Sequence, residues 1–130
     1  MKTKVTGRLF SVLLVLLPFS FPLPLLAHHS VAEFDIEQEV TIQATVTEVW
    51  FNNPHVRFYA AATDADGKEI AWDIHTSSPN SLIRNGWYGD AIKVGDKVSF
   101  IGNPTRSGEP RLLVHTVQLP DGSAVSSRRQ

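Results

Sequence analysis

The sequence predicts a mostly β domain: a five-stranded barrel with one short helix between its third and fourth strands. Two observations lead to this prediction. Apolar and polar residues alternate in short segments between residues 40 and 120, as half-buried strands require. The segments come in the order three strands, one helix and two strands, which is the order of an OB-fold. A small open β-sandwich is the alternative, but a sandwich of this size seldom needs an intervening helix.

The first three strands are predicted from alternation and from the turns between them. From residue 40 to 47, β-branched and apolar residues alternate with Thr and Gln, and the strand continues to Phe51 before Asn52-Asn53-Pro54 stops it. The second strand is expected at about 55–63 and the third at about 68–76. Between them, Asp64-Ala65-Asp66-Gly67 favours a tight hairpin in which Gly67 adopts positive φ.

The helix is predicted from its ends. Ser78 is a suitable N-cap, Pro79 fits the first helical position, and Gly86 fits the position after the last turn. Leu82 and Ile83 are expected to pack inward.

The last two strands are expected at 97–101 and at about 111–119. They are joined by a loop over 103–110 that is rich in Gly and Pro.

The N-terminus has the pattern of a secretory signal peptide. A cationic start precedes an apolar stretch at 9–17, and a segment broken by three prolines ends on Ala27. Cleavage after Ala27 predicts a periplasmic or secreted protein with no membrane anchor in its mature form. An uncleaved anchor is the alternative, because residues 9–27 approach the length of a bilayer span. The chain has no cysteine, which excludes disulfides, thiolate metal sites and a lipid-modified N-terminus.

Cleavage leaves 103 residues, enough for one domain with one core. The expected division is a signal peptide (1–27), a flexible polar segment (28–39), the OB-like barrel (40–120) and a disordered tail (121–130). The mature chain carries nine Lys and Arg against thirteen Asp and Glu, so its net charge is −4. An acidic exported domain is a poor candidate for nucleic-acid binding, which depends on basic residues that neutralise phosphates.

The second and third strands are predicted to share a polar face. Their apolar positions must both face the core, which fixes the register of the hairpin. Tyr59 is then opposite Asp73, Arg57 is opposite His75, and His55 is diagonal to His75. In OB-folds this face and the adjoining loops bind ligands, so we expect the binding surface here.

Four histidines suggest a metal site. After cleavage, His28 would offer a free amine and an imidazole, and His29 would add the intervening amide and its own ring. Such nitrogen-rich sets favour Cu(II) or Ni(II), so copper is the candidate ligand, with His55 or His75 completing the set. The segment before residue 40 spans roughly 35 Å when extended, enough to reach the face. The alternative is a polar tail and ordinary surface histidines, with His55 bonding the loop backbone.

The same face supports a second interpretation, in which it binds a small organic molecule, a glycan or a protein partner. The residues expected to contact that ligand are Trp50, Phe51, Arg57, Tyr59 and Asp73. Arg57 and Asp73 are also well explained as a cross-strand ion pair. The acidic run from Glu33 to Glu39 is most simply a solvated segment. The chain has no nucleophile elbow, phosphate loop or His-Glu-x-x-His motif, so no enzyme activity is predicted.

Short motifs, each weak alone, are spread over nearly all of the mature chain. They are His28-His29-Ser30, Glu33-Phe34-Asp35, Asn53-Pro54-His55, Ser78-Pro79-Asn80, Arg84-Asn85-Gly86-Trp87, Gly95-Asp96 and Leu119-Pro120-Asp121-Gly122. In this order and spacing they resemble the domain-of-unknown-function 6152 family of small exported bacterial proteins. The resemblance implies a bacterial source and an extracytoplasmic OB-like domain, and it brings no activity, substrate or catalytic residue. Related sequences have an acidic residue near the position of His75, so the resemblance favours His28, His29 and His55 as ligands.

Together these observations predict an exported, non-enzymatic binding module. Copper held by the mature N-terminal histidines is the leading candidate ligand. A small organic ligand, a glycan or a protein partner on the polar face is the alternative.

Overall fold

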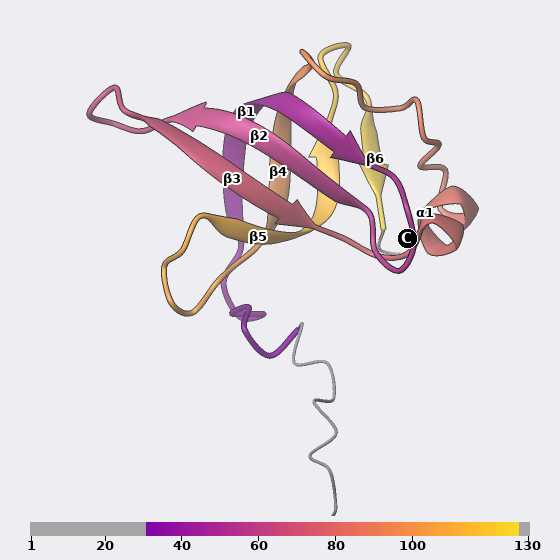
Figure 1. Cartoon of the computed structure of the whole chain (residues 1–130), viewed down its shortest axis with the longest axis horizontal. Coiled ribbons are helices and arrows are strands. Elements are labelled where there is room, and N and C mark those ends of the chain that lie inside the picture. Colours follow the sequence, from indigo (N-terminus) through magenta and orange to yellow (C-terminus); the bar gives the residue numbers. More distant parts are fainter. Residues whose placement is uncertain (1–30, 128–130) are drawn as a thin grey trace, which may run out of the picture.

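The structure, a computed structural model, describes residues 31–127. Its elements in chain order are β1 (Val40–Trp50), β2 (Arg57–Thr63), β3 (Glu69–His75), α1 (Pro79–Arg84), β4 (Lys97–Pro104), β5 (Arg111–Gln118) and β6 (Ala124–Ser126), shown in Figure 1. The predicted order of three strands, one helix and two strands is confirmed, with β6 added after it. Within residues 31–127, no helix is long and apolar enough to cross a membrane.

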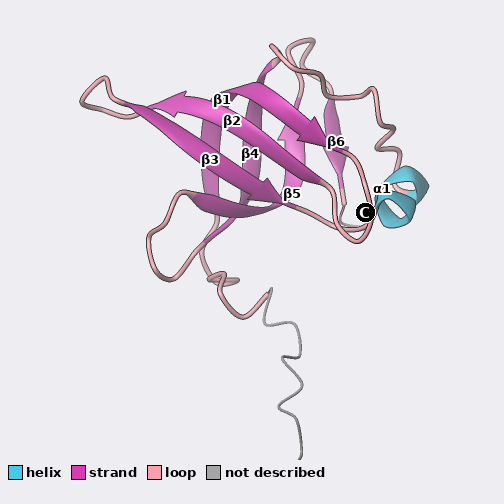
Figure 2. Cartoon of the chain, viewed as in Figure 1, coloured by secondary structure: helices cyan, strands magenta, loops and turns pink. Residues whose placement is uncertain are grey.

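The strands form one sheet that closes on itself (Figure 2). The sheet order is β3-β2-β1-β4-β5-β6, and a parallel pairing of β3 with β5 joins the two ends of the first five strands. The other neighbouring strands are antiparallel. The result is a closed five-stranded barrel with a short helix between its third and fourth strands, which confirms the predicted OB-like fold.

The register of the β2–β3 hairpin is the one that alternation predicts. Arg57 pairs with His75 and Tyr59 pairs with Asp73. Gly67 in the connecting turn has φ of 79°, which residues with a side chain rarely adopt. The polar face of the hairpin is therefore placed as the sequence predicts.

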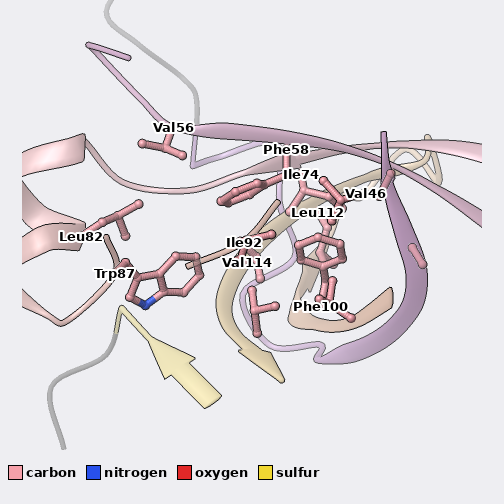
Figure 3. Packing of buried hydrophobic residues seen from close by; sticks show 14 residues of the cluster. Val46, Val56, Phe58, Ile74, Leu82, Trp87, Ile92, Phe100, Leu112 and Val114 are labelled. Carbon is pink, nitrogen blue, oxygen red and sulfur yellow. The ribbon is translucent and has the colours of Figure 1, made fainter. Parts of the chain in front are cut away.

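Apolar side chains from all five barrel strands and from the helix fill the interior (Figure 3). Phe58 lies between Trp87 and Phe100, with ring centroids 6.2 and 6.0 Å apart. Leu82 of α1 and Trp87 are both buried in the same cluster, so the helix is fixed to the barrel by this packing.

The helix has the predicted ends but only one inward-facing apolar residue. Ser78 is the N-cap and accepts a hydrogen bond from the Ser81 amide, and Gly86 follows the C-cap with φ of 86°. Leu82 is fully buried, whereas Ile83 is 43% exposed, so the prediction that both pack inward is wrong. Adjacent helical positions lie about 100° apart, and a helix of this length has a single face against the barrel.

β1 contains a bulge that alternation did not predict. It lies between Val46 and Glu48 and adds one residue to the strand. In a regular strand, Val46 and Val49 would face opposite sides because they are three positions apart. The bulge lets both pack on the core, and the following Trp50 points to the outer face.

β4 is longer than predicted. It continues to Pro104, so the loop begins at Thr105 instead of residue 103. The reason is Gly102, where a Cβ would lie 2.3 Å from the carbonyl oxygen of Leu113. A residue without a side chain lets β4 and β5 approach closely at the point where their register shifts.

The segments expected to be flexible are held against the barrel where the structure describes them. Ala124–Ser126 forms β6 and pairs with β5, which differs from the disorder expected from residue 121. Near the other end, Phe34 is 1% exposed, and the Asp35 amide donates to the Pro104 carbonyl. Asn103 donates a side-chain hydrogen bond to the Gln38 carbonyl. We call residues 31–39 the N-terminal arm. The buried side chain of Phe34 anchors this arm, whereas the sequence predicted a flexible segment here.

Candidate functional site

The outer face of the barrel carries two rows of cross-strand partners. The first row is Trp50, Arg57, His75 and Leu113. The second row is Glu48, Tyr59, Asp73 and Arg111. Directly paired residues project from the same face of a sheet, so these eight side chains share one surface, the paired face.

Most of the predicted ligand residues lie on the paired face, but Phe51 does not. Trp50 is 49% exposed, and Arg57 lies over the ring of Tyr59, with its guanidinium carbon 5.6 Å from the ring centroid. Phe51 is half-buried against the core and lies beside Gly89. Phe51 follows the end of β1, so the loop, and not the alternation of the strand, sets the direction of its side chain.

Asp73 is the centre of a charged network on the paired face. Arg57 donates from Nε to Oδ1 over 3.1 Å and from Nη2 to Oδ2, which forms the predicted cross-strand ion pair. Nε2 of His75 lies 3.0 Å from Oδ2 of Asp73 and 3.3 Å from Nη2 of Arg57. Asp73 therefore binds both an arginine on the neighbouring strand β2 and the histidine two residues later in its own strand.

Arg111 extends this network from a third strand. The parallel pairing of β3 with β5 places Arg111 opposite Asp73, with Nε 3.9 Å from Oδ2. Arg111 also donates from Nη2 to Oε1 of Glu33 over 2.9 Å. Sequence reasoning missed Arg111, because its position depends on barrel closure between distant strands and no local pattern reports that pairing.

The network favours the charged forms of Asp73 and Arg57. Burial alone would raise the pKa of Asp73, but hydrogen bonds from Arg57 and His75 outweigh it and hold that pKa below the ordinary carboxyl value. The hydrogen bond to Asp73 raises the pKa of Arg57 against the opposing effect of burial. Asp73 is therefore a carboxylate at neutral pH, and both residues are already paired.

A small cavity lies beside His75, next to this network. Its volume is about 160 Å³, and its lining residues are Val31, Phe34, His55, His75, Thr76, Ser77 and Leu113. The ring of Phe34 meets His75 edge-on, with centroids 5.6 Å apart. Four separate stretches of chain thus line the cavity, and they bring together two histidines and two hydroxyl-bearing residues. We call this the histidine cavity.

His55 and His75 lie together at this cavity, as their diagonal positions predicted. His55 precedes β2 and is exposed. Within residues 31–127 it makes no hydrogen bond to the loop backbone, and the neighbouring contact is from the Val56 amide to the Ser77 carbonyl. His75 is half-buried, and its Nδ1 has no hydrogen-bond partner among the described residues.

Thr76 is a further residue of the cavity that sequence reasoning missed. It is 5% exposed, and its hydroxyl oxygen has no hydrogen-bond partner within the part of the chain that the structure describes. Only its position directly after His75, at the end of β3, could have drawn attention to it.

The acidic arm is paired with basic residues, contrary to the expectation of a solvated segment. Besides the Glu33 contact, Asp35 lies 3.8 Å from Arg106, and Glu39 lies 2.9 Å from Nε2 of His115. Nδ1 of His115 also contacts the hydroxyl of Thr116 at 3.0 Å. These pairs tie the arm to β5 and the preceding loop.

His28 and His29 lie outside the described residues. Among residues 31–127, no group of three or more histidine or carboxylate side chains forms a ready metal site. A metal at the histidine cavity would therefore need ligands beyond His55 and His75.

A larger hollow of about 400 Å³ lies between β1, β2 and β4. It is lined mainly by Ala, Thr, Gln and Ser, with Lys97 as its one charged residue. It brings no titratable groups together, so the histidine cavity is the better candidate site despite its smaller volume.

Comparison with known proteins gives one finding. A family model described as a family of unknown function (DUF6152) matches residues 18–113, which include β1 to β4, the whole arm and both cavity histidines. The comparison with curated proteins gives no match.

Proposed function

This chain belongs to the DUF6152 family, whose function is unknown, and we propose that it is an exported module that binds copper. The metal would be held by the mature N-terminus, with His28 and His29, and by His55 at the histidine cavity. His75 is the fourth candidate ligand.

The proposed copper site depends on export of the protein and on cleavage of its signal peptide. The cationic start, apolar stretch and small residue at Ala27 form a signal-peptide pattern, which supports cleavage before His28 and delivery to the periplasm or the exterior. The new terminus carries a free amine next to two imidazoles. An amine, a deprotonated amide and imidazoles together form the nitrogen set that Cu(II) prefers.

One observation carries the proposal: Val31 lines the same cavity as His55 and His75. His28 is three positions before Val31, so it lies within roughly 10 Å of chain length from Val31. The N-terminal nitrogens and the cavity histidines are thus within reach of one metal ion. The docked arm supports this, because Phe34 is buried and contacts His75, which fixes the first described residues beside the cavity.

The test is a copper titration of the mature protein beginning at His28, followed by calorimetry and electron spin resonance. We expect one tight equivalent with a nitrogen-rich spectrum. Adding one glycine before His28 or making His55→Ala should each lower affinity about tenfold or more, while His115→Ala should leave it unchanged. If both altered proteins bind copper like the wild type, or if binding is weak and of several equivalents, the proposal is wrong.

A second candidate is an organic ligand, a glycan or a protein partner on the paired face. The observation that favours it is the exposure of Trp50 beside Arg57, which stacks over Tyr59. Aromatic and arginine side chains of this kind are enriched at binding surfaces. A ligand found by thermal-shift screening should lose affinity in Trp50→Ala and be indifferent to the N-terminal glycine. A screen with no stabilising ligand, or binding that Trp50→Ala leaves intact, would count against this candidate.

A further inference from the structure

β1 and β2 separate at one end of the barrel. Their pairing ends at Thr45 and Ala61. Beyond that pair, β1 continues beside β4 only, towards Val40, and β2 continues beside β3 only, to Thr63. The β2–β3 hairpin therefore extends away from β1 (Figure 1), and the sheet has an opening between the two strands.

A cavity of about 320 Å³ lies at this opening, and we call it the mouth cavity. Its apolar wall consists of Ile42, Ala62, Ile70 and Trp72. Trp72 pairs with the buried Ala60, so this wall continues the core side of the sheet. Sites for small organic molecules are typically about 300–1,000 Å³ in volume and often lie in the mouths of β-barrels. The size and the place of the mouth cavity therefore suit a small organic molecule.

The mouth cavity is also lined by Asp64, whose carboxylate is held in the hairpin turn. Oδ1 of Asp64 accepts hydrogen bonds from the amides of Asp66 and Lys68, each over 2.9 Å. Oδ2 has no hydrogen-bond or ion-pair partner among residues 31–127. The turn thus fixes the carboxylate and leaves one of its oxygens available to a ligand.

The charge around the mouth cavity is negative. Residues 64–69 carry three carboxylates, those of Asp64, Asp66 and Glu69, and one ammonium, that of Lys68, so their net charge is −2. A cationic ligand is attracted by this charge and an anionic ligand is repelled. The ring of Trp72 adds to the preference, because the face of an indole attracts cations.

We propose that the mouth cavity binds a small organic cation, which is an ammonium group carried on an apolar body. The ammonium donates to Oδ2 of Asp64, and the apolar body lies against Ile70 and Trp72. The mouth cavity shares no lining residue with the histidine cavity, so this inference does not depend on the proposed copper site.

The test uses the metal-free mature protein and protonated phenethylamine as the probe, and binding is followed by NMR. The resonances of the Trp72 indole and the Ile70 methyl groups should shift saturably, whereas those of the Trp50 indole should not. The neutral counterpart, 2-phenylethanol, should bind about five- to tenfold more weakly, because a hydrogen bond between charged groups is the stronger one. The anion phenylacetate should bind more weakly still.

Two variants of the turn form a matched pair. Asp64→Asn keeps the oxygen that accepts from the two amides and removes the charge. It should lower the affinity for protonated phenethylamine about five- to tenfold and change that for 2-phenylethanol less than about twofold. Asp66→Asn removes the same charge from a residue that does not line the mouth cavity. Its affinity for the amine should stay within about twofold of the wild type.

The proposal is overturned if no saturable binding of the amine occurs, or if its shifts centre on Trp50. It is also overturned if 2-phenylethanol or phenylacetate binds as tightly as the amine, or if Asp64→Asn and Asp66→Asn lower amine affinity equally. Thermal unfolding establishes that each variant is folded. If Asp64→Asn does not fold, the three probes on the wild type still decide the outcome.

Discussion

His75 and His115 lie on paired strands, and each contacts a carboxylate, yet their surroundings differ in one decisive way. Both ring nitrogens of His115 have partners, the Thr116 hydroxyl and the Glu39 carboxylate. Within residues 31–127, Nε2 is the one ring nitrogen of His75 that is engaged, by Asp73 and Arg57, and the ring borders a cavity. A histidine with both nitrogens bonded fastens one segment to another. A histidine with one nitrogen held and the other unpartnered within the described chain is oriented for binding.

We expect the largest change in stability from a substitution of Phe34. This residue anchors the arm, and the arm contacts both His75 and His115. Phe34 is buried and contacts His75, and the same arm carries Glu39, the partner of His115. Phe34→Ala should lower the free energy of unfolding by about 3–5 kcal/mol, as expected for a buried aromatic. Urea unfolding measures this.

The control for Phe34→Ala is Ile36→Ala in the same arm. Ile36 is 63% exposed, so its substitution should change the unfolding free energy by less than about 0.5 kcal/mol. Equal losses in the two variants would mean that the arm is not anchored through Phe34.

Copper affinity directly tests whether His75 and His115 contribute differently to metal binding. His75→Ala should weaken copper binding about tenfold, which is roughly 1.4 kcal/mol, because it removes an imidazole from the cavity. His115→Ala should leave copper binding unchanged, since that ring is bonded elsewhere. Calorimetry on the two variants measures the difference. Equal effects would show that the unpartnered nitrogen of His75 has no special role.

The carboxylates that hold the two histidines should also differ. The pKa of Asp73 is lowered in the folded protein, so its stabilising effect is present above the ordinary aspartate pKa of about 4 and is lost as the pH falls below it. Asp73→Asn should therefore cost about 1 kcal/mol at pH 7, and progressively less as the pH falls below about 4. Glu39→Gln, in the more exposed pair, should cost less at pH 7.

Urea unfolding of both carboxylate variants across pH measures this difference. A cost of Asp73→Asn that stays constant from pH 7 to pH 3 would contradict the assigned direction of the Asp73 pKa.

The smallest effect is a gain in stability. Thr76→Val removes a buried hydroxyl without a partner, so the metal-free protein should become more stable by roughly 0.5–1 kcal/mol. Thermal unfolding of the metal-free protein measures this. A clear loss of stability would mean that the hydroxyl has a structural partner.

Local sequence patterns were sufficient to predict most of the barrel. Alternation in β2 and β3, with a glycine turn between them, determined the register that places Arg57 opposite His75. The helix ends followed from Ser78 and Gly86 because capping depends on residues near in sequence. These features depend on short-range geometry, which a single sequence contains.

The features that escaped prediction depend on contacts between distant segments. Arg111 joins Asp73 only because β3 and β5 close the barrel, and Phe34 reaches His75 only because the arm folds back along the surface. The strand β6 is three residues long, too short for alternation to be visible in a Ser-rich tail. The sequence therefore predicted only part of the candidate site. The strand register predicted that its two histidines lie together, whereas the other residues that line the cavity were found only in the structure.

The short strand β6 also bears on how copies of this protein meet one another. One edge of β5 pairs with β3 through Arg111 to Leu113 and then with β6 through Thr116 to Gln118. Without β6, that second stretch would present unpaired backbone groups, which other chains readily add to as an extra strand. A chain ending before Ala124 should therefore keep its barrel but scatter light increasingly with concentration. We therefore expect β6 to limit self-association through this edge of β5.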